Sequence, residues 1–283
     1  MGVGSRQPRQ PEPARGLDSD PTFAASRLRG EILLFEVWRG ACSCRGVMSI
    51  SMQLQRAALG ALDLIFPTRC ASCDAPGESP FCGVCADTLI PLAAGCPLCG
   101  APGDDALLPA LRPRRCPHCR ARPPPFASAA APYLHGGALA EAIHRLKYDQ
   151  REDLGLSLGV LFEACAVPKS DCLCPIPLHP RRLRERGYDQ ARLLAGGAAK
   201  RFRLPVESLL ARVRDTGQQV GRDRAARERN VRGAFRAFPR ARGLRICLVD
   251  DVLTTGATAA AAAEALLLAG AARVEVRTLA RAP

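Results

Sequence analysis

Eight cysteines form four Cys-x-x-Cys pairs within residues 70–119. They are Cys70 and Cys73, Cys82 and Cys85, Cys96 and Cys99, and Cys116 and Cys119. Two cysteines three residues apart on a tight turn can bind one metal ion, and two such turns complete a tetrahedral four-thiolate site. The sequence therefore predicts two structural zinc ions, each with every coordination position filled by the protein.

Other chemistry is open to the same cysteines. A redox Cys-x-x-Cys normally opens a helix of a thioredoxin-like unit, and that context is missing here. An iron–sulfur cluster uses the same thiolate ligands as zinc. The pairing is also open, because either neighbouring pairs or alternating pairs can share an ion. His118 lies between Cys116 and Cys119, and we interpret it as a surface residue rather than a fifth ligand.

A second group of reactive residues lies in Leu248–Thr258, with the sequence LVDDVLTTGAT. Gly256 permits a tight turn, and amide groups at the start of a following helix can bind a phosphate. Paired carboxylates at a strand end suit ribose hydroxyls, directly or through Mg²⁺ and water. Asp and Thr also serve as ordinary helix caps, which is the alternative interpretation. The predicted sugar-phosphate site comprises Asp250, Asp251, Val252, Leu253, Thr254, Thr255, Gly256, Ala257 and Thr258.

Positive charge is concentrated in one part of the chain. The 283 residues carry 40 Lys and Arg against 27 Asp and Glu, a net charge of +13, and residues 181–245 alone hold 19 basic and 6 acidic residues. Such an excess favours an anionic partner: phosphate, nucleic acid or a membrane surface. The alternative is a pair of solvated, arginine-rich helices.

The residues after 125 alternate between helical and strand-like patterns. We expect helices at 139–148, 153–165, 190–201 and 257–269, the last with Gly270 as its C-cap. We expect strands at 171–177, 245–250 and 273–279. Alternation of this kind predicts an α/β fold with a mostly parallel sheet flanked by helices.

The chain divides into four segments by composition. Residues 1–47 are rich in Pro, Arg, Gly and Ser, and are either disordered or the product of a start codon placed upstream of Met48 or Met52. Residues 48–66 predict an amphipathic helix, 67–125 the cysteine module, and 126–283 the α/β domain. No apolar run approaches the roughly 18–20 residues of a membrane span, and no secretory signal is present, so we expect a cytoplasmic protein.

Taken in order, these motifs resemble the ComF family. The segments are DLIFPTRCASC, LKYDQ, PIPLHPRRLRERGYDQA, RDTGQQ, RERNVRGAF and LVDDVLTTGAT, and the resemblance as a whole covers Asp63 to about Thr278. Asp189 departs from the pattern, since relatives usually carry Asn there. The resemblance implies a double zinc ribbon joined to a domain with the type I phosphoribosyltransferase fold.

The resemblance also implies residue roles. Asp250 and Asp251 would contact the ribose hydroxyls of phosphoribosyl pyrophosphate, and residues 254–258 would bind its 5′-phosphate. The turn after Ile176 would face the pyrophosphate, and residues 212–235 would form a mobile flap. The residues implied to contact the pyrophosphate or another anion are Arg184, Arg186, Lys147 and Arg214.

Three functions follow from this sequence. The chain is a phosphoribosyltransferase, or it binds single-stranded DNA during DNA uptake without turnover, or it senses a phosphoribosyl ligand and controls a partner through its zinc ribbon. The implied partners are phosphoribosyl pyrophosphate or a related sugar phosphate with Mg²⁺, single-stranded DNA, and a competence helicase or other DNA-uptake protein. No acceptor-binding segment is readable, so enzymatic turnover is left open.

Overall fold

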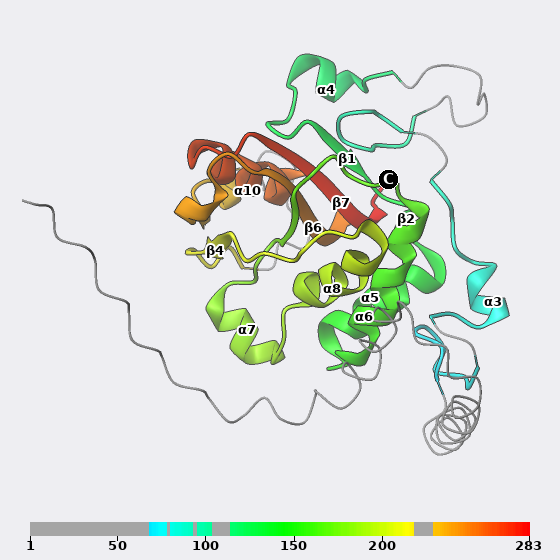
Figure 1. Cartoon of the computed structure of the whole chain (residues 1–283). Coiled ribbons are helices and arrows are strands. Elements are labelled where there is room, and N and C mark those ends of the chain that lie inside the picture. Colours follow the sequence, from blue (N-terminus) through cyan, green and yellow to red (C-terminus); the bar gives the residue numbers. More distant parts are fainter. Residues whose placement is uncertain (1–67, 78–79, 93–94, 104–113, 218–228) are drawn as a thin grey trace, which may run out of the picture. The chain divides into compact units, whose positions relative to one another are not determined.

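The computed structural model describes residues 68–77, 80–92, 95–103, 114–217 and 229–283. The chain divides into two units, 1–61 and 62–283, and all described residues belong to the second. The predicted N-terminal extension (1–47) and amphipathic helix (48–66) therefore lie outside the described residues. Figure 1 shows the described elements in sequence colours.

The cysteine module has little regular structure. Its two short helices are α3 (Gly83–Ala86) and α4 (Pro117–Ala121), and each begins directly after a cysteine. Cys116 caps α4, because its sulfur accepts a hydrogen bond from the Cys119 amide. Such short helices bury little apolar surface of their own, so the module needs both metal and docking to hold its shape.

The α/β part is built on one parallel sheet. Its strands pair in the order β1-β7-β6-β3, and β2 pairs with β7 beyond β1. The strands are β1 (Ser128–Ala130), β2 (Tyr133–Leu134), β3 (Cys172–Pro175), β6 (Arg245–Leu253) and β7 (Arg273–Arg281). A separate antiparallel pair is formed by β4 (Leu210–Arg212) and β5 (Phe235–Ala237).

Helices cover both faces of the sheet (Figure 1). The helices of this part are α5 (Gly137–Tyr148), α6 (Asp153–Gly159), the 3₁₀ helix η4 (Val160–Ala164), α7 (Pro180–Arg186), α8 (Gln190–Phe202), the 3₁₀ helix η5 (Pro239–Ala241) and α10 (Ala257–Leu268). Of these, α7 buries no residue. Strand β6 shows why two layers of helices are needed. Its Ile246 and Leu248 pack with α10, whereas Cys247 and Val249 pack with α5, α6 and α8. A strand that is apolar on both faces must be covered on both.

The predicted α/β class is confirmed, and the principal helices and strands lie close to their predicted positions. Most predicted boundaries agree with the structure within two residues, and two differ by more. The helix expected at 153–165 ends at Gly159 and tightens into η4, as helix ends often do. The strand expected at 245–250 continues to Leu253, because β7 offers partners as far as Arg281.

Helices α6 and α8 cross unusually closely. A Cβ atom added to Gly197 would lie 2.6 Å from the Leu156 carbonyl oxygen and 2.7 Å from the Gly159 Cα. The backbones touch at a point where glycines face one another. This contact fixes α8, whose first residue, Gln190, lies at the carboxyl end of the sheet.

Candidate functional site

The two acidic residues of the predicted site lie near the carboxyl end of β6, and strand alternation sends their side chains to opposite faces of the sheet. Asp251 follows the face of Cys247 and Val249 and is 4% exposed. Asp250 is half-buried. Open α/β sheets bind ligands at the carboxyl ends of their strands, so this edge is where a site is expected.

Asp251 is held by two side chains. Lys147 Nζ lies 2.6 Å from its Oδ1, and Gln190 Nε2 donates to its Oδ2 at 3.3 Å. Lys147 is in the last turn of α5 and Gln190 begins α8, so two helices converge on one carboxylate. Burial opposes the charge on Lys147, but Asp251 and then Asp250 outweigh it and raise its pKa. The sequence predicted Lys147. Gln190 was not predicted as a site residue, although it lies in the segment PIPLHPRRLRERGYDQA.

Asp250 has a strongly altered pKa. Burial, and then repulsion from Asp251, raise the pKa of its carboxyl to about 8, although Lys147 acts in the opposite direction. Asp250 Oδ1 also accepts a hydrogen bond from the Asp251 amide at 2.9 Å. A carboxyl that is kept protonated by its surroundings is stabilised in its ionised form when a cation binds beside it. A pair of carboxylates suits Mg²⁺ that is also bound by substrate phosphates.

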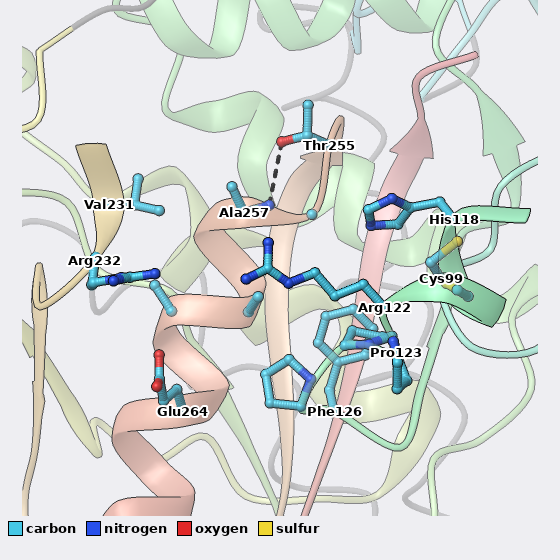
Figure 2. Close-up of a pocket in the computed structure, with 16 residues that line it drawn as sticks. Cys99, His118, Arg122, Pro123, Phe126, Val231, Arg232, Thr255, Ala257 and Glu264 are labelled. Carbon is cyan, nitrogen blue, oxygen red and sulfur yellow. Dashed lines mark hydrogen bonds between the residues drawn. The ribbon is translucent and has the colours of Figure 1, made fainter. Parts of the chain in front are cut away.

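The loop after β6 has the geometry of an anion cradle. Gly256 has a φ of +81° and no close neighbour, so its backbone conformation rather than space requires glycine. Thr255 Oγ1 accepts a hydrogen bond from the Ala257 amide at 3.3 Å, which Figure 2 shows at the start of α10. The twelve-residue helix α10 therefore begins with its amide groups directed at the loop, where an anion is stabilised.

One buried arginine holds the start of the loop that follows β6. Arg281, 6% exposed at the end of β7, donates from Nη1 to the carbonyl oxygens of Leu253 (2.8 Å) and Thr254 (2.7 Å). Its Nε donates to the Cys99 carbonyl oxygen at 3.2 Å. A buried guanidinium thus joins the loop to the part of the cysteine module that contains Cys99. The sequence alone did not show this residue, because an arginine near a chain end reads as solvated.

The three remaining predicted arginines are not brought together. Arg186, in α7, donates to Gln190 Oε1 and lies over the Tyr148 ring at 5.6 Å, so it joins the Asp251 network. Arg184 is exposed on the same helix. Arg214 Nη1 donates to the Arg232 carbonyl oxygen at 2.6 Å, which joins the two ends of the segment predicted as a flap. Residues 218–228 of that predicted flap lie outside the described residues.

The cysteines form two separate clusters of four. Cys70, Cys73, Cys82 and Cys85 make one, and Cys96, Cys99, Cys116 and Cys119 the other, with all ligand atoms of a cluster within 4.8 Å of one another. Neighbouring pairs are therefore grouped. The Sγ atoms of Cys73 and Cys82 are 3.7 Å apart, as are those of Cys99 and Cys116. Sulfurs about 2.3 Å from a tetrahedral zinc are about 3.8 Å apart, so both clusters suit structural zinc.

The first cluster docks on α5 through Arg145. This guanidinium donates to the carbonyl oxygens of Ala71 and Ser72, each at 3.1 Å, and to Asp74 Oδ1 at 3.0 Å. Arg151 adds a 2.8 Å contact to the same Asp74 oxygen. The last turn of α5 therefore carries both Arg145, which holds the cluster, and Lys147, which contacts Asp251. Both cysteine clusters are tied to elements of the candidate site.

Comparisons with known proteins agree with this architecture. Residues 61–110 match a family model described as a double zinc ribbon domain. The chain is 32% identical over 230 residues to DNA utilization protein YhgH of Salmonella typhi, covering 77% of this chain and 99% of the relative. It is 34% identical over 119 residues to competence protein F of Haemophilus influenzae, covering 40% of this chain and 51% of that protein. The chain belongs to the ComF family. The resemblance stated from the sequence is confirmed.

A structural comparison of this ComF protein finds a partial match. Glutamine phosphoribosylpyrophosphate amidotransferase from B. subtilis, complexed with ADP and GMP, matches 43% of this chain and 25% of its own, with 26% identity and a TM-score of 0.31.

Within the described residues, no helix has both the length and the apolar character needed to span a membrane.

Proposed function

We propose that this ComF-family protein binds a 5-phosphoribosyl ligand, phosphoribosyl pyrophosphate or a related sugar phosphate, together with Mg²⁺. The observation that carries the proposal is the joined arrangement of the Asp250–Asp251 pair, the turn at Gly256 and the amide end of α10. The pair offers acceptors to ribose hydroxyls and ligands to the metal, and the turn offers donors to the 5′-phosphate. Residues 254–258 form this phosphate loop.

A basic recess offers a place for the pyrophosphate. It has a volume of about 210 Å³ and is lined by Lys147, Tyr148, Gln150, Arg182, Glu185 and Arg186. Lys147 joins this recess to Asp251, so the leaving end of the ligand would lie beside the ribose subsite. When Mg²⁺ is bound it would neutralise the pyrophosphate charge, while the arginines of α7 hold the anion in place.

Binding, rather than transfer, is the function proposed. Transfer would also require an acceptor whose own nucleophilic atom reaches C1 of the ribose, and the described residues do not identify that acceptor. We further propose a zinc-ribbon segment at 67–125, a ligand-binding domain at 126–283, a role in DNA uptake or use, and a cytoplasmic location. The names of the relatives, a DNA utilization protein and a competence protein, support the role in DNA uptake or use.

Calorimetry on the full zinc-loaded chain tests the proposal. Phosphoribosyl pyrophosphate with Mg²⁺ should bind saturably to the native protein and at least tenfold more weakly to Asp250→Asn/Asp251→Asn. The matched control is Asp149→Asn, which removes one carboxylate outside the pair and should leave the affinity unchanged. Failure of the native protein to bind, with two zinc ions present per chain, would reject the proposal.

The basic surface favours single-stranded DNA as a second candidate ligand. Exposed arginines follow α7 and residues 232–242, and they are Arg181, Arg184, Arg232, Arg236, Arg240 and Arg242. Phosphate contacts from such side chains weaken steeply with salt. Anisotropy of a labelled oligonucleotide between 50 and 200 mM salt measures how steeply the logarithm of the binding constant falls with the logarithm of the salt concentration. The expected slope is about 0.7 for each phosphate contact of a single strand. An affinity that does not change with salt would exclude this surface.

A further inference from the structure

A second pocket lies outside the ribose subsite. It has a volume of about 630 Å³ and lies between the second cysteine cluster, the segment 122–126 that follows α4, and the first two turns of α10 (Figure 2). It shares one wall, Thr255–Ala257, with the phosphate loop. Cavities of a few hundred Å³ with a few convergent polar groups are typical of small-molecule sites.

One end of this pocket is strongly basic. Arg122 and Arg232 come from segments more than a hundred residues apart in sequence, and they reach toward each other across Ala257 (Figure 2). The amide end of α10 adds positive partial charge at the same place. Glu264, the acidic residue among the described lining residues, lies two turns further along α10, which is about 10 Å. The basic end thus suits a phosphate.

The other side of the pocket is flat and apolar. Pro123, Pro124 and Pro125 lead into Phe126, which is 2% exposed, and Ala260 and Ala261 face them from α10. A run of three prolines is stiff and carries no amide donors. Such a wall can pack against the face of a nucleobase by apolar contact, and it offers no side-chain hydrogen bonds that would distinguish one base from another.

We propose that this pocket is a nucleotide subsite. The phosphate lies between Arg122 and Arg232 at the first turn of α10, and the base lies against Pro123–Phe126. The subsite goes beyond the ribose pocket and rests on the proposed function only in sharing the phosphate loop. A free mononucleotide and one nucleotide of a single strand present the same chemistry here. A strand would fill both places, because a phosphodiester in the loop would join the nucleotide in the ribose subsite to the 3′-oxygen of the preceding nucleotide in this pocket.

Calorimetry on the full zinc-loaded chain tests this subsite with adenosine 5′-monophosphate, the 5′-phosphorylated adenosine dinucleotide and inorganic phosphate. Arg122→Gln and Arg232→Gln should each weaken binding of the mononucleotide about tenfold, because each removes one charge-assisted contact. Arg201→Gln removes an exposed arginine from α8 and is the matched control. Ala261→Phe fills the pocket without changing charge and should also weaken binding.

The probes separate the two sources of ligand. A dinucleotide that binds at least tenfold more tightly than the mononucleotide identifies a strand, and equal affinities identify a free nucleotide; both support the subsite. Inorganic phosphate that binds as tightly as the mononucleotide would overturn it, as would arginine variants that bind like Arg201→Gln. Phosphoribosyl pyrophosphate binding should survive in Arg122→Gln and be lost in Asp250→Asn/Asp251→Asn, so the pocket and the proposed function fail separately.

Discussion

Asp250 and Asp251 are neighbours in sequence, yet they meet different surroundings. Asp251 is compensated by Lys147 Nζ at 2.6 Å and by Gln190. Burial of the Asp250 carboxyl and repulsion from the Asp251 charge raise the pKa of Asp250 to about 8. The folded protein therefore keeps a proton on Asp250 at pH values where the unfolded chain has lost it. This destabilisation is the reserve that a bound cation would release.

Substitution of Asp250 should reveal that reserve as a pH-dependent gain of stability. The folded state holds more protons than the unfolded state between the ordinary pKa of 3.8 and about 8, so its free energy of unfolding falls as pH rises through this range. Asp250→Asn removes the effect. We expect the variant to match the native protein near pH 4 and to exceed it by about 1 kcal/mol or more at pH 8, which is about 2–4 °C in Tm.

Thermal unfolding at unit steps from pH 5 to pH 9 measures this difference. Asp149→Asn, at the end of α5, is the control and should show no such trend. A Tm difference for Asp250→Asn that is constant across the range would mean that Asp250 is ionised normally in the free protein.

At the scale of elements, α8 is placed by its contact with α6. Gly159 and Gly197 let the two backbones touch, and this contact sets the height of Gln190 relative to Asp251. At Gly196, one residue earlier, an added Cβ would meet only the Leu156 Cδ2 atom at 3.2 Å. Adjacent glycines therefore differ in what they allow.

Alanine substitutions at these two glycines should differ in sign. Gly197→Ala places a methyl group 2.6 Å from a carbonyl oxygen, so the helices must separate, at about 1–3 kcal/mol of the free energy of unfolding. Gly196→Ala gains helix propensity of up to about 1 kcal/mol and needs only a rotation of Leu156. Urea unfolding of both variants measures the difference. Equal effects would show that the helices do not touch as described.

How much of these elements the sequence predicts depends on how local their causes are. For the strand-loop-helix around Gly256, the starts of the strand and of the helix were predicted correctly and the helix end to within one residue, since the apolar run, the turn and the alanine-rich helix are adjacent in the chain. Helix α7 and the pair β4–β5 were not assigned from the sequence. Arginine-rich α7 has no buried residues, and three-residue strands depend on a partner far along the chain.

The site shows the same division. Lys147 and the acidic pair were predicted because they lie in recognisable segments. Gln190 and Arg281 act on groups 61 and 27–28 residues away, and sequence spacing does not show such partners. The grouping of cysteines into neighbouring pairs likewise required the folded structure. The segment limits at 67–125 and 126–283 stay predictions.

At the scale of the whole molecule, two arginines join the cysteine module to the α/β part of the chain. Arg145 holds the first cluster on α5, and Arg281 connects the Cys99 carbonyl of the second cluster to the carbonyls of Leu253 and Thr254. Zinc bound in these clusters would therefore do more than order its own loops, because it would hold carbonyl groups in the positions that these guanidinium groups require.

Arg281 is accordingly a positioning residue for the phosphate loop. Arg281→Met should retain both zinc ions but leave buried carbonyls without donors, lowering the free energy of unfolding by about 2–3 kcal/mol. Arg273→Met is the control, because that arginine lies on the same strand, is about half-exposed and contacts Glu275. Phosphoribosyl pyrophosphate affinity, measured at 15 °C where both variants are folded, should fall about tenfold in Arg281→Met alone.

Amide exchange distinguishes positioning from general destabilisation. In Arg281→Met, exchange should accelerate at residues 253–258 and 96–101 together, because one guanidinium holds both segments. Arg281→Lys retains a donor that can reach one of the carbonyls, so affinity should recover in part. Acceleration spread evenly over the sheet, with no recovery in the lysine variant, would mean that Arg281 contributes stability only. Acceleration confined to the two segments would show that the second zinc cluster and the phosphate loop behave as one unit.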